Sequence, residues 1–142
     1  MTMTDNRQCS PALSAPLKLS EDTSVPREAI PEVVRRILEI GRQRELPIVI
    51  FGHISDGNLH PNILFDQADP EEMVRVEAAS GDIFEVATSV GGTLSGEHGI
   101  GLLKQKYLHL DLPEGSVQVM RTIKRALDPD DIMNPGKIFP DD

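Results

Sequence analysis

Residues 47–65 read PIVIFGHISDGNLHPNILF, and this stretch decides the fold of the chain. Two strand-like apolar runs, 47–54 and 59–65, flank a short polar segment with Asp56-Gly57 at its centre. An Asp-Gly pair between two such runs is a strong hairpin signal, because a type I′ turn needs a positive φ at both central residues. The sequence therefore predicts a β-hairpin with Asp56 and Gly57 as its turn.

The predicted register determines which side chains share a face of this hairpin. It pairs Ser55 with Asn58, Ile54 with Leu59, and His53 with His60. Asn62 lies two residues beyond His60 and so shares its face. Opposed Cβ atoms are roughly 4.5–5.5 Å apart, so the two imidazoles can reach one metal ion, although a hydrogen-bonded structural role is the alternative. The opposite face is expected in the core and carries Ile48, Ile50, Ile54, Leu59, Ile63 and Phe65. Pro61 cannot donate to a ladder, which implies an edge or a bulge there.

Helical patterns lie on both sides of the hairpin. Apolar spacing predicts one helix from Ile30 to near Arg44, and a second that starts at Pro70 with Asp69 as its N-cap and stops at Gly91-Gly92. A third is predicted from about Glu114 to Leu127, with Val117, Met120, Ile123 and Leu127 facing inward. Residues 1–19 are expected to be weakly structured, with a short extended segment around 17–25. The predicted fold class is α+β, an antiparallel sheet with helices packed on one face.

The glycine-rich segment 91–101 reads GGTLSGEHGIG and carries the second group of candidate site residues. Its glycines let a loop approach a cofactor closely. Glu97 would complete a set of two histidines and one carboxylate, which leaves open positions on a metal for water or substrate. A neutral His98 beside it could accept a proton from a metal-bound hydroxyl. An anion-binding turn that uses Lys104, or a simply mobile loop, are the alternatives.

Composition excludes several classes of protein. A length of 142 residues favours one domain. The formal net charge of -9 argues against nucleic-acid or anionic-membrane binding. One cysteine excludes an internal disulfide framework and fits a reducing compartment. No apolar run approaches the ~20 residues that span a bilayer, so we expect a cytoplasmic protein without a transmembrane segment.

Three motifs, in order, give the sequence a specific resemblance. They are FGHISDGNLHPN, GGTLSGEHGIG followed by KQKYL, and LDPDDIMNPGKIF. Over about residues 20–140 the chain resembles the C-terminal region of FAD-linked 2-hydroxyacid oxidases and dehydrogenases, which include the glycolate oxidase FAD-linked subunit, D-lactate dehydrogenase and D-2-hydroxyglutarate dehydrogenase. The resemblance implies a domain over residues 20–142 that is the ferredoxin-like half of the family's cap domain plus a C-terminal helical segment.

The resemblance also implies roles for individual residues. It implies metal ligation by His53, His60 and Glu97, with zinc or manganese as the expected ion, and a catalytic base at His98. It places Asn62 on the substrate side, and Asn134 and Lys137 near the flavin. The implied reaction is oxidation of a D-2-hydroxy acid to the 2-oxo acid, with FAD as hydride acceptor.

The family's FAD-binding domain has no counterpart in residues 1–46, since no βαβ unit fits there. We therefore expect a fragment or subunit that acts with an FAD-bearing partner and self-associates without it. One alternative is a non-catalytic remnant or interaction module of the same fold. Another is a stand-alone enzyme with a metal held by two histidines and one carboxylate.

Overall fold

The computed structural model describes residues 17–140. Most of the segment 1–19 therefore lies outside the described residues, and its last three residues belong to the first strand. The elements in chain order are β1 (Leu17–Ser20), β2 (Thr23–Ser24), η2 (Arg27–Ala29), α2 (Ile30–Gln43), β3 (Ile48–His53), β4 (Asn58–Phe65), α3 (Pro70–Ser89), η3 (Gln105–Leu110) and α4 (Glu114–Leu127).

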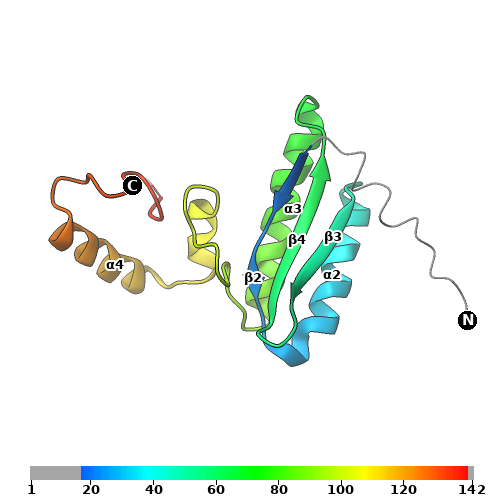
Figure 1. The fold of residues 1–142 in the computed structure, drawn as a ribbon, viewed down its shortest axis with the longest axis horizontal. Coiled ribbons are helices and arrows are strands. Elements are labelled where there is room, and N and C mark those ends of the chain that lie inside the picture. The colour runs from blue at the N-terminus through cyan, green and yellow to red at the C-terminus, as the bar shows by residue number, and fades with distance from the viewer. Residues whose placement is uncertain (1–16, 141–142) are drawn as a thin grey trace, which may run out of the picture.

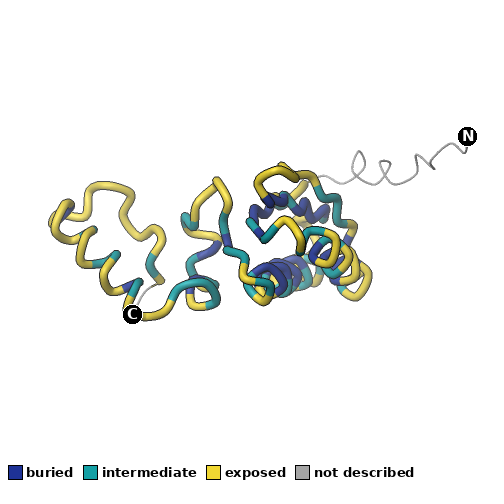
Figure 2. The backbone as a smooth tube through the Cα atoms, turned by 90° about the horizontal axis from the view of Figure 1, so that it is seen from below, coloured by how far each residue is buried: buried dark blue, intermediate teal, exposed yellow. Residues whose placement is uncertain are grey.

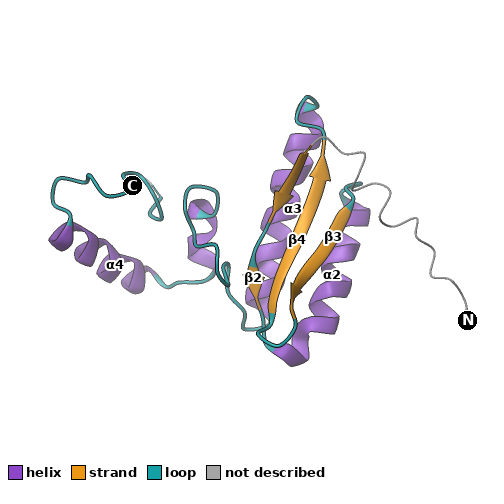
Figure 3. Ribbon diagram, viewed as in Figure 1, coloured by secondary structure: helices purple, strands orange, loops and turns teal. Residues whose placement is uncertain are grey.

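The four strands form one antiparallel sheet with β4 in the middle. Strand β3 pairs with one side of β4, while β1 and β2 pair one after the other with its opposite side (Figure 3). Helices α2 and α3 lie side by side against a single face of this sheet (Figure 1). The architecture is thus an α+β fold with helices on one face, as the sequence predicts.

The hydrophobic core fills the space between the sheet and these two helices. Its centre consists of Val33 and Ile37 from α2, Leu59 and Ile63 from β4, and Val76, Ala79, Ile83 and Ala87 from α3. Ile48, Ile50 and Phe65 pack against it, so the predicted core face of the hairpin is confirmed at those positions. The alternation of a strand then directs His60 and Asn62 to the other face of β4.

The start of α3 follows the expected capping chemistry. Asp69 accepts hydrogen bonds from the backbone nitrogens of Glu71 (2.9 Å) and Glu72 (3.2 Å). Pro70 occupies the first helical position, where its missing N–H is not needed. The carboxylate of Glu72 reaches back to the nitrogen of Asp66 at 2.8 Å. These bonds fix where the chain leaves β4 and enters the helix.

The hairpin turn is longer than predicted, and the register is shifted. Residues 54–57 form a four-residue turn in which Gly57 alone has a positive φ, of 73°. His53 therefore pairs with Asn58, and His60 pairs with Phe51. Ile54, expected in the core, is 72% exposed in the turn. The shift is two residues, which equals the side-chain period of a strand, so His53 and His60 keep the same face.

Pro61 lies in the central strand, opposite the break between β1 and β2. The backbone nitrogen of Glu21 donates to the oxygen of Pro61 at 2.8 Å, and the proline has no N–H to return that bond. The ladder is interrupted there, which is how the sheet accommodates a proline at this central position.

Helix α4 lies away from the sheet, on the far side of η3 (Figure 1). Its bounds agree with the prediction, but its expected inward face is mostly not covered. Val117 is buried, whereas Ile123 is 54% and Leu127 is 73% exposed. Figure 2 shows the contrast between this exposed segment and the buried body of the fold. Helical spacing predicts an apolar face but not what covers it. Within residues 17–140, no helix combines the length and apolar character needed to cross a bilayer.

Candidate metal and substrate site

Two histidines from the hairpin lie next to each other on the face of the sheet that the helices leave open. The rings of His53 and His60 have their centroids 5.6 Å apart and stand nearly perpendicular to each other, at 89°. The side chain of His60 is only 15% exposed, whereas His53 is exposed at the end of β3. The structure brings both imidazoles together on one face, as expected, but the predicted direct pair is wrong, because His53 and His60 are diagonal neighbours across the strands.

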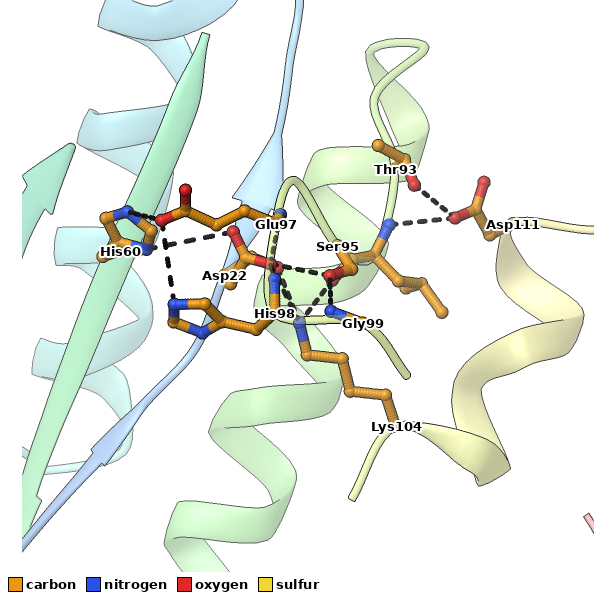
Figure 4. A network of polar contacts seen from close by, with 10 residues as sticks. Asp22, His60, Thr93, Ser95, Glu97, His98, Gly99, Lys104 and Asp111 are labelled. Atoms are coloured by element: carbon orange, nitrogen blue, oxygen red, sulfur yellow. Dashed lines mark hydrogen bonds and ion pairs between the residues drawn. The ribbon is translucent and has the colours of Figure 1, made fainter. Parts of the chain in front are cut away.

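The glycine-rich loop brings Glu97 and His98 to the same place (Figure 4). The Oε1 atom of Glu97 lies 3.2 Å from Nε2 of His60 and 3.8 Å from Nε2 of His98. The rings of His60 and His98 are stacked, with centroids 5.2 Å apart and an interplanar angle of 16°. Glu97 and His98 are both about half exposed, so their polar atoms can be reached from solvent.

The donor atoms of His53, His60 and Glu97 all lie within 4.8 Å of one another. Ligands of a tetrahedral zinc ion are about 3.3 Å apart, from bonds of ~2.0–2.1 Å, so small side-chain adjustments suffice. A second set, Asp22 with His60 and His98, meets the same distance condition. That set shares His60 with the first. Its carboxylate, Asp22, is buried and already accepts hydrogen bonds from the loop. The first set is the one whose carboxylate, Glu97, is half exposed.

Asp22 anchors the loop that carries Glu97 and His98. Its side chain is 0% exposed, and its Oδ2 atom accepts from Ser95 Oγ at 2.6 Å, Glu97 N at 3.0 Å and His98 N at 2.8 Å. Burial by itself raises the pKa of Asp22, but these hydrogen bonds outweigh it and hold the pKa below its ordinary value of 3.8.

Sequence reasoning did not identify Asp22 as a site residue. The available signal was the acidic pair Glu21-Asp22 inside a short segment expected to be extended, since a carboxylate that becomes buried there needs hydrogen-bond donors. The donors come from residues more than 70 positions later in the chain. The local sequence around Asp22 therefore gives no information about these hydrogen-bond donors.

Lys104 and Asp111 hold the remainder of the loop. Lys104 is buried, and its Nζ donates to the backbone oxygens of Asp22 and Leu94, both at 2.7 Å. Burial lowers the pKa of Lys104, while Asp22 and Glu21 oppose that effect. Asp111 accepts from Thr93 Oγ1 at 2.6 Å and from Leu94 N at 3.0 Å. Because the ammonium of Lys104 donates to these buried oxygens, the structure does not support an anion-binding turn that uses Lys104. The hydrogen bonds of Lys104 and Asp111 also hold the loop in place, which argues against a simply mobile loop.

The loop backbone at Gly96 passes so close to the side chain of Asn58 that only glycine fits there. A Cβ atom at Gly96 would lie 2.7 Å from the side chain of Asn58, which is itself buried at the start of β4. Gly57 shows the same principle in the hairpin turn, where a Cβ would lie 2.0 Å from the oxygen of Val25. Glycine at these positions lets the loop and the turn pack against their neighbours.

Glu21 gives the site region a pH-dependent stability that can be measured. Burial raises the pKa of Glu21 above 4.5, and the nearby Ser80 hydroxyl and the positive charge of Lys104 only partly oppose this. The folded state therefore holds this proton more tightly than the unfolded state, and stability falls as pH rises through 4.5 toward the folded pKa. We expect Glu21→Gln to unfold at a higher temperature than wild type at pH 7, with a smaller difference at pH 4.

The matched control for this experiment is Glu28→Gln, at an exposed glutamate of the same region. Thermal unfolding followed by circular dichroism at both pH values gives the comparison. A Glu21→Gln variant that is less stable than wild type at pH 7 would show that the charged form of Glu21 stabilises the fold.

The other predicted site residues lie in two different places. Asn62 is buried one side-chain repeat beyond His60, and its Nδ2 donates to the backbone oxygen of His60 at 2.7 Å. Asn134 and Lys137 lie in the tail that follows α4, and Figure 1 shows this tail far from the hairpin. Lys137 lines a cavity of 340 Å³ together with Arg121, Lys124 and Arg125. The structure thus groups His53, His60, Asn62, Glu97 and His98, and leaves the two tail residues apart.

Comparison with known proteins identifies the family of the chain. The family model described as FAD linked oxidases, C-terminal domain, matches residues 8–138, and the chain belongs to this family. The glycolate oxidase subunit GlcD of Bacillus subtilis (strain 168) is 43% identical over 127 residues, which cover 89% of this chain and 27% of that protein.

Two further relatives carry other names within the same class. The D-lactate dehydrogenase [cytochrome], mitochondrial, of Arabidopsis thaliana is 38% identical, over 84% of this chain and 21% of that protein. The D-2-hydroxyglutarate dehydrogenase of Stutzerimonas stutzeri (strain A1501) is 38% identical, over 83% of this chain and 26% of that protein. The chain therefore spans about a quarter of the length of these curated relatives.

Proposed function

We propose that this chain is the metal- and substrate-binding C-terminal part of an FAD-dependent oxidoreductase that converts a D-2-hydroxy acid of the glycolate or D-lactate type to the 2-oxo acid. The observation that carries the proposal is the convergence of His53, His60 and Glu97 within 4.8 Å, with His98 beside them. The names of the relatives support the class of substrate.

The residues present fit a divalent cation such as Zn²⁺ or Mn²⁺. Two imidazole nitrogens and one carboxylate oxygen form a donor set typical of catalytic metal sites with free positions. His60 is largely buried and held by its strand, while Glu97 is held through its backbone by Asp22. His53 is exposed at the strand end and is free to adjust its ring.

In the proposed oxidation, the cation and the flavin would supply part of the chemistry, and residues of this chain supply the rest. When bound, the cation would supply polarisation of the substrate's hydroxyl and carboxylate oxygens, and the flavin would supply the acceptor for the hydride from the α-carbon. His98 accepts the hydroxyl proton at Nε2, the atom that faces Glu97. The substrate thus gives up one hydride and one proton, which together make the two-electron oxidation of an alcohol to a ketone or aldehyde.

Asn62 contributes to this site by supporting His60 and by its place on the substrate side. Its Oδ1 atom is buried without a hydrogen-bond partner among residues 17–140. Asn134 and Lys137 are proposed to lie near the flavin. Their tail borders a pocket of mixed charge, in which Lys124 forms ion pairs with Asp128 and Asp131. The support for this placement is the family match, which includes both residues.

We propose that an FAD-bearing partner or further domain covers the exposed face of α4. Val119, Ile123 and Leu127 form an apolar stripe at helical spacing, and the exposed Ile132 and Met133 follow it. Exposed apolar surface of this kind is typical of an interface. The same surface would support self-association of the isolated chain. One of the relatives is named as a subunit, which agrees with a multi-chain enzyme. We also propose a cytoplasmic location, for which the single cysteine is the support.

Metal analysis followed by reconstitution tests the function. We expect the chain, purified without chelator, to carry one divalent metal ion, and to support flavin reduction by glycolate or D-lactate only when an FAD-bearing partner is added. Metal binding without activity in the reconstituted mixture would favour a non-catalytic remnant. Oxygen consumption with Fe(II) and a 2-oxo acid, without flavin, would favour a stand-alone metalloenzyme.

A further inference from the structure

We infer that Asp22 is the positioning residue of this site: one buried carboxylate fixes the backbone of Glu97 and His98 and also directs the ring of His60, so that the Nε2 atom of His60 is left to bind the cation. The inference rests on the proposed function. It concerns a residue that does not itself touch the substrate or the metal.

The sheet register brings Asp22 and His60 together. The pairs Ser20↔Asn62 and Thr23↔Leu59 belong to the same register, which continues across the break between β1 and β2. Asp22 thus falls opposite His60, on the face of the sheet that carries the site. The interruption of the ladder at Pro61 leaves Asp22 outside both strands, where its side chain is free to meet the loop.

The two oxygens of Asp22 have separate neighbours. Oδ2 accepts from Ser95 Oγ and from the backbone nitrogens of Glu97 and His98, so its acceptor capacity is used by the loop. Oδ1 lies 3.8 Å from Nδ1 of His60. Both of these atoms are buried, and neither has a hydrogen-bond partner within residues 17–140. Each is therefore the natural partner of the other.

A carboxylate next to Nδ1 determines how His60 can act. An ionised carboxylate only accepts hydrogen bonds, so it favours a proton on Nδ1. A neutral imidazole with its proton on Nδ1 presents a free lone pair at Nε2, and Nε2 is the atom that lies 3.2 Å from Glu97. Metal-binding histidines in proteins commonly donate their second ring nitrogen to a carboxylate in this way, and the 3.8 Å separation is one that closes when the site is loaded.

Asp22→Asn separates the role of this carboxylate toward His60 from its role toward the loop. If the amide oxygen takes the three hydrogen bonds of Oδ2, the amide NH₂ faces His60. A donor at that place requires Nδ1 to be an acceptor, which moves the proton to Nε2. The variant therefore keeps the loop anchored but blocks the atom that binds the cation.

The matched control is Asp111→Asn. Asp111 anchors the same loop by accepting two hydrogen bonds, from Thr93 Oγ1 and Leu94 N. Within residues 17–140 it forms no hydrogen bond or ion pair with the site histidines. The Asp111→Asn variant reproduces the change from carboxylate to amide and the perturbation of the loop, but it leaves the carboxylate next to His60 unchanged.

The experiment measures zinc affinity by competition with a chromophoric chelator, together with the ¹H–¹⁵N spectrum of the zinc-loaded chain. We expect Asp22→Asn to lose roughly 10–100-fold in affinity, while Asp111→Asn stays within about 2-fold of wild type. We also expect a hydrogen-bonded Nδ1–H signal from His60 in wild type that is lost in Asp22→Asn.

The outcomes distinguish this inference from the function on which it rests. Equal losses in the two variants, or no hydrogen-bonded Nδ1–H at His60 in the zinc-loaded wild type, would overturn the inference while the metal site stands. The second of these needs no variant, so it decides the matter even if Asp22→Asn does not fold. A wild-type chain that binds zinc no better than His60→Ala overturns both proposals.

Discussion

Replacing His60 by alanine is expected to reduce the affinity for a divalent cation by more than about 100-fold, because loss of a direct ligand exceeds the 10–100-fold effect of an outer-shell partner. His60 is the residue on which the site converges: it faces Glu97, stacks on His98 and lies beside His53. Its removal leaves one imidazole and one carboxylate. Isothermal titration with Zn²⁺ or Mn²⁺ measures the change.

The matched control for that titration is His109→Ala. His109 is exposed near the end of η3 and belongs to neither group of residues that can hold a metal ion. It should bind the ion as wild type does. Equal affinity of His60→Ala and His109→Ala for the ion would show that His60 of the hairpin is not a metal ligand.

Replacing His98 by glutamine is expected to lower turnover of the reconstituted enzyme by about 10²–10⁴-fold, the usual contribution of a general base. Glutamine keeps a polar side chain but cannot accept the substrate proton. The loop should not change, because His98 is held to Asp22 through its backbone nitrogen at 2.8 Å and not through its ring. The measurement is the rate of flavin reduction at saturating 2-hydroxy acid.

Metal affinity provides the internal control for this variant. His98→Gln should bind Zn²⁺ within about 2-fold of wild type, since His98 lies outside the proposed ligand set. A normal turnover in this variant would exclude His98 as the base. A large loss of metal affinity would instead make His98 a ligand, as in the alternative group with Asp22 and His60.

The sequence predicted the faces of the hairpin better than its turn. Asp56-Gly57 suggested a two-residue loop, whereas the turn contains four residues and only Gly57 adopts a positive φ. The resulting shift of two residues preserved every inward and outward assignment within the strands, because side chains alternate with a period of two. Ile54 was wrong because it lies in the turn itself.

Features that depend on distant parts of the chain were not predictable in the same way. The position of His98 beside His60 depends on hydrogen bonds to Asp22, which lies 76 residues away in sequence. The exposed face of α4 has ideal amphipathic spacing, yet spacing gives no information about the surface that covers it. Motif resemblance suggested the candidate site residues, whereas the residues that support them became visible only in three dimensions.

The hydrogen bonds of Asp22 and Lys104 have a consequence for how a metal ion would enter the proposed site. The buried carboxylate of Asp22 already holds the backbone of Glu97 and His98, and the buried Lys104 links Asp22 to Leu94 in the same loop. The conformational entropy of this segment is therefore lost during folding and would not be lost again on binding a cation. The donor atoms of the proposed ligands already lie within 4.8 Å of one another. Binding of a cation to the proposed site would then proceed without the ordering transition that accompanies binding to an unstructured loop.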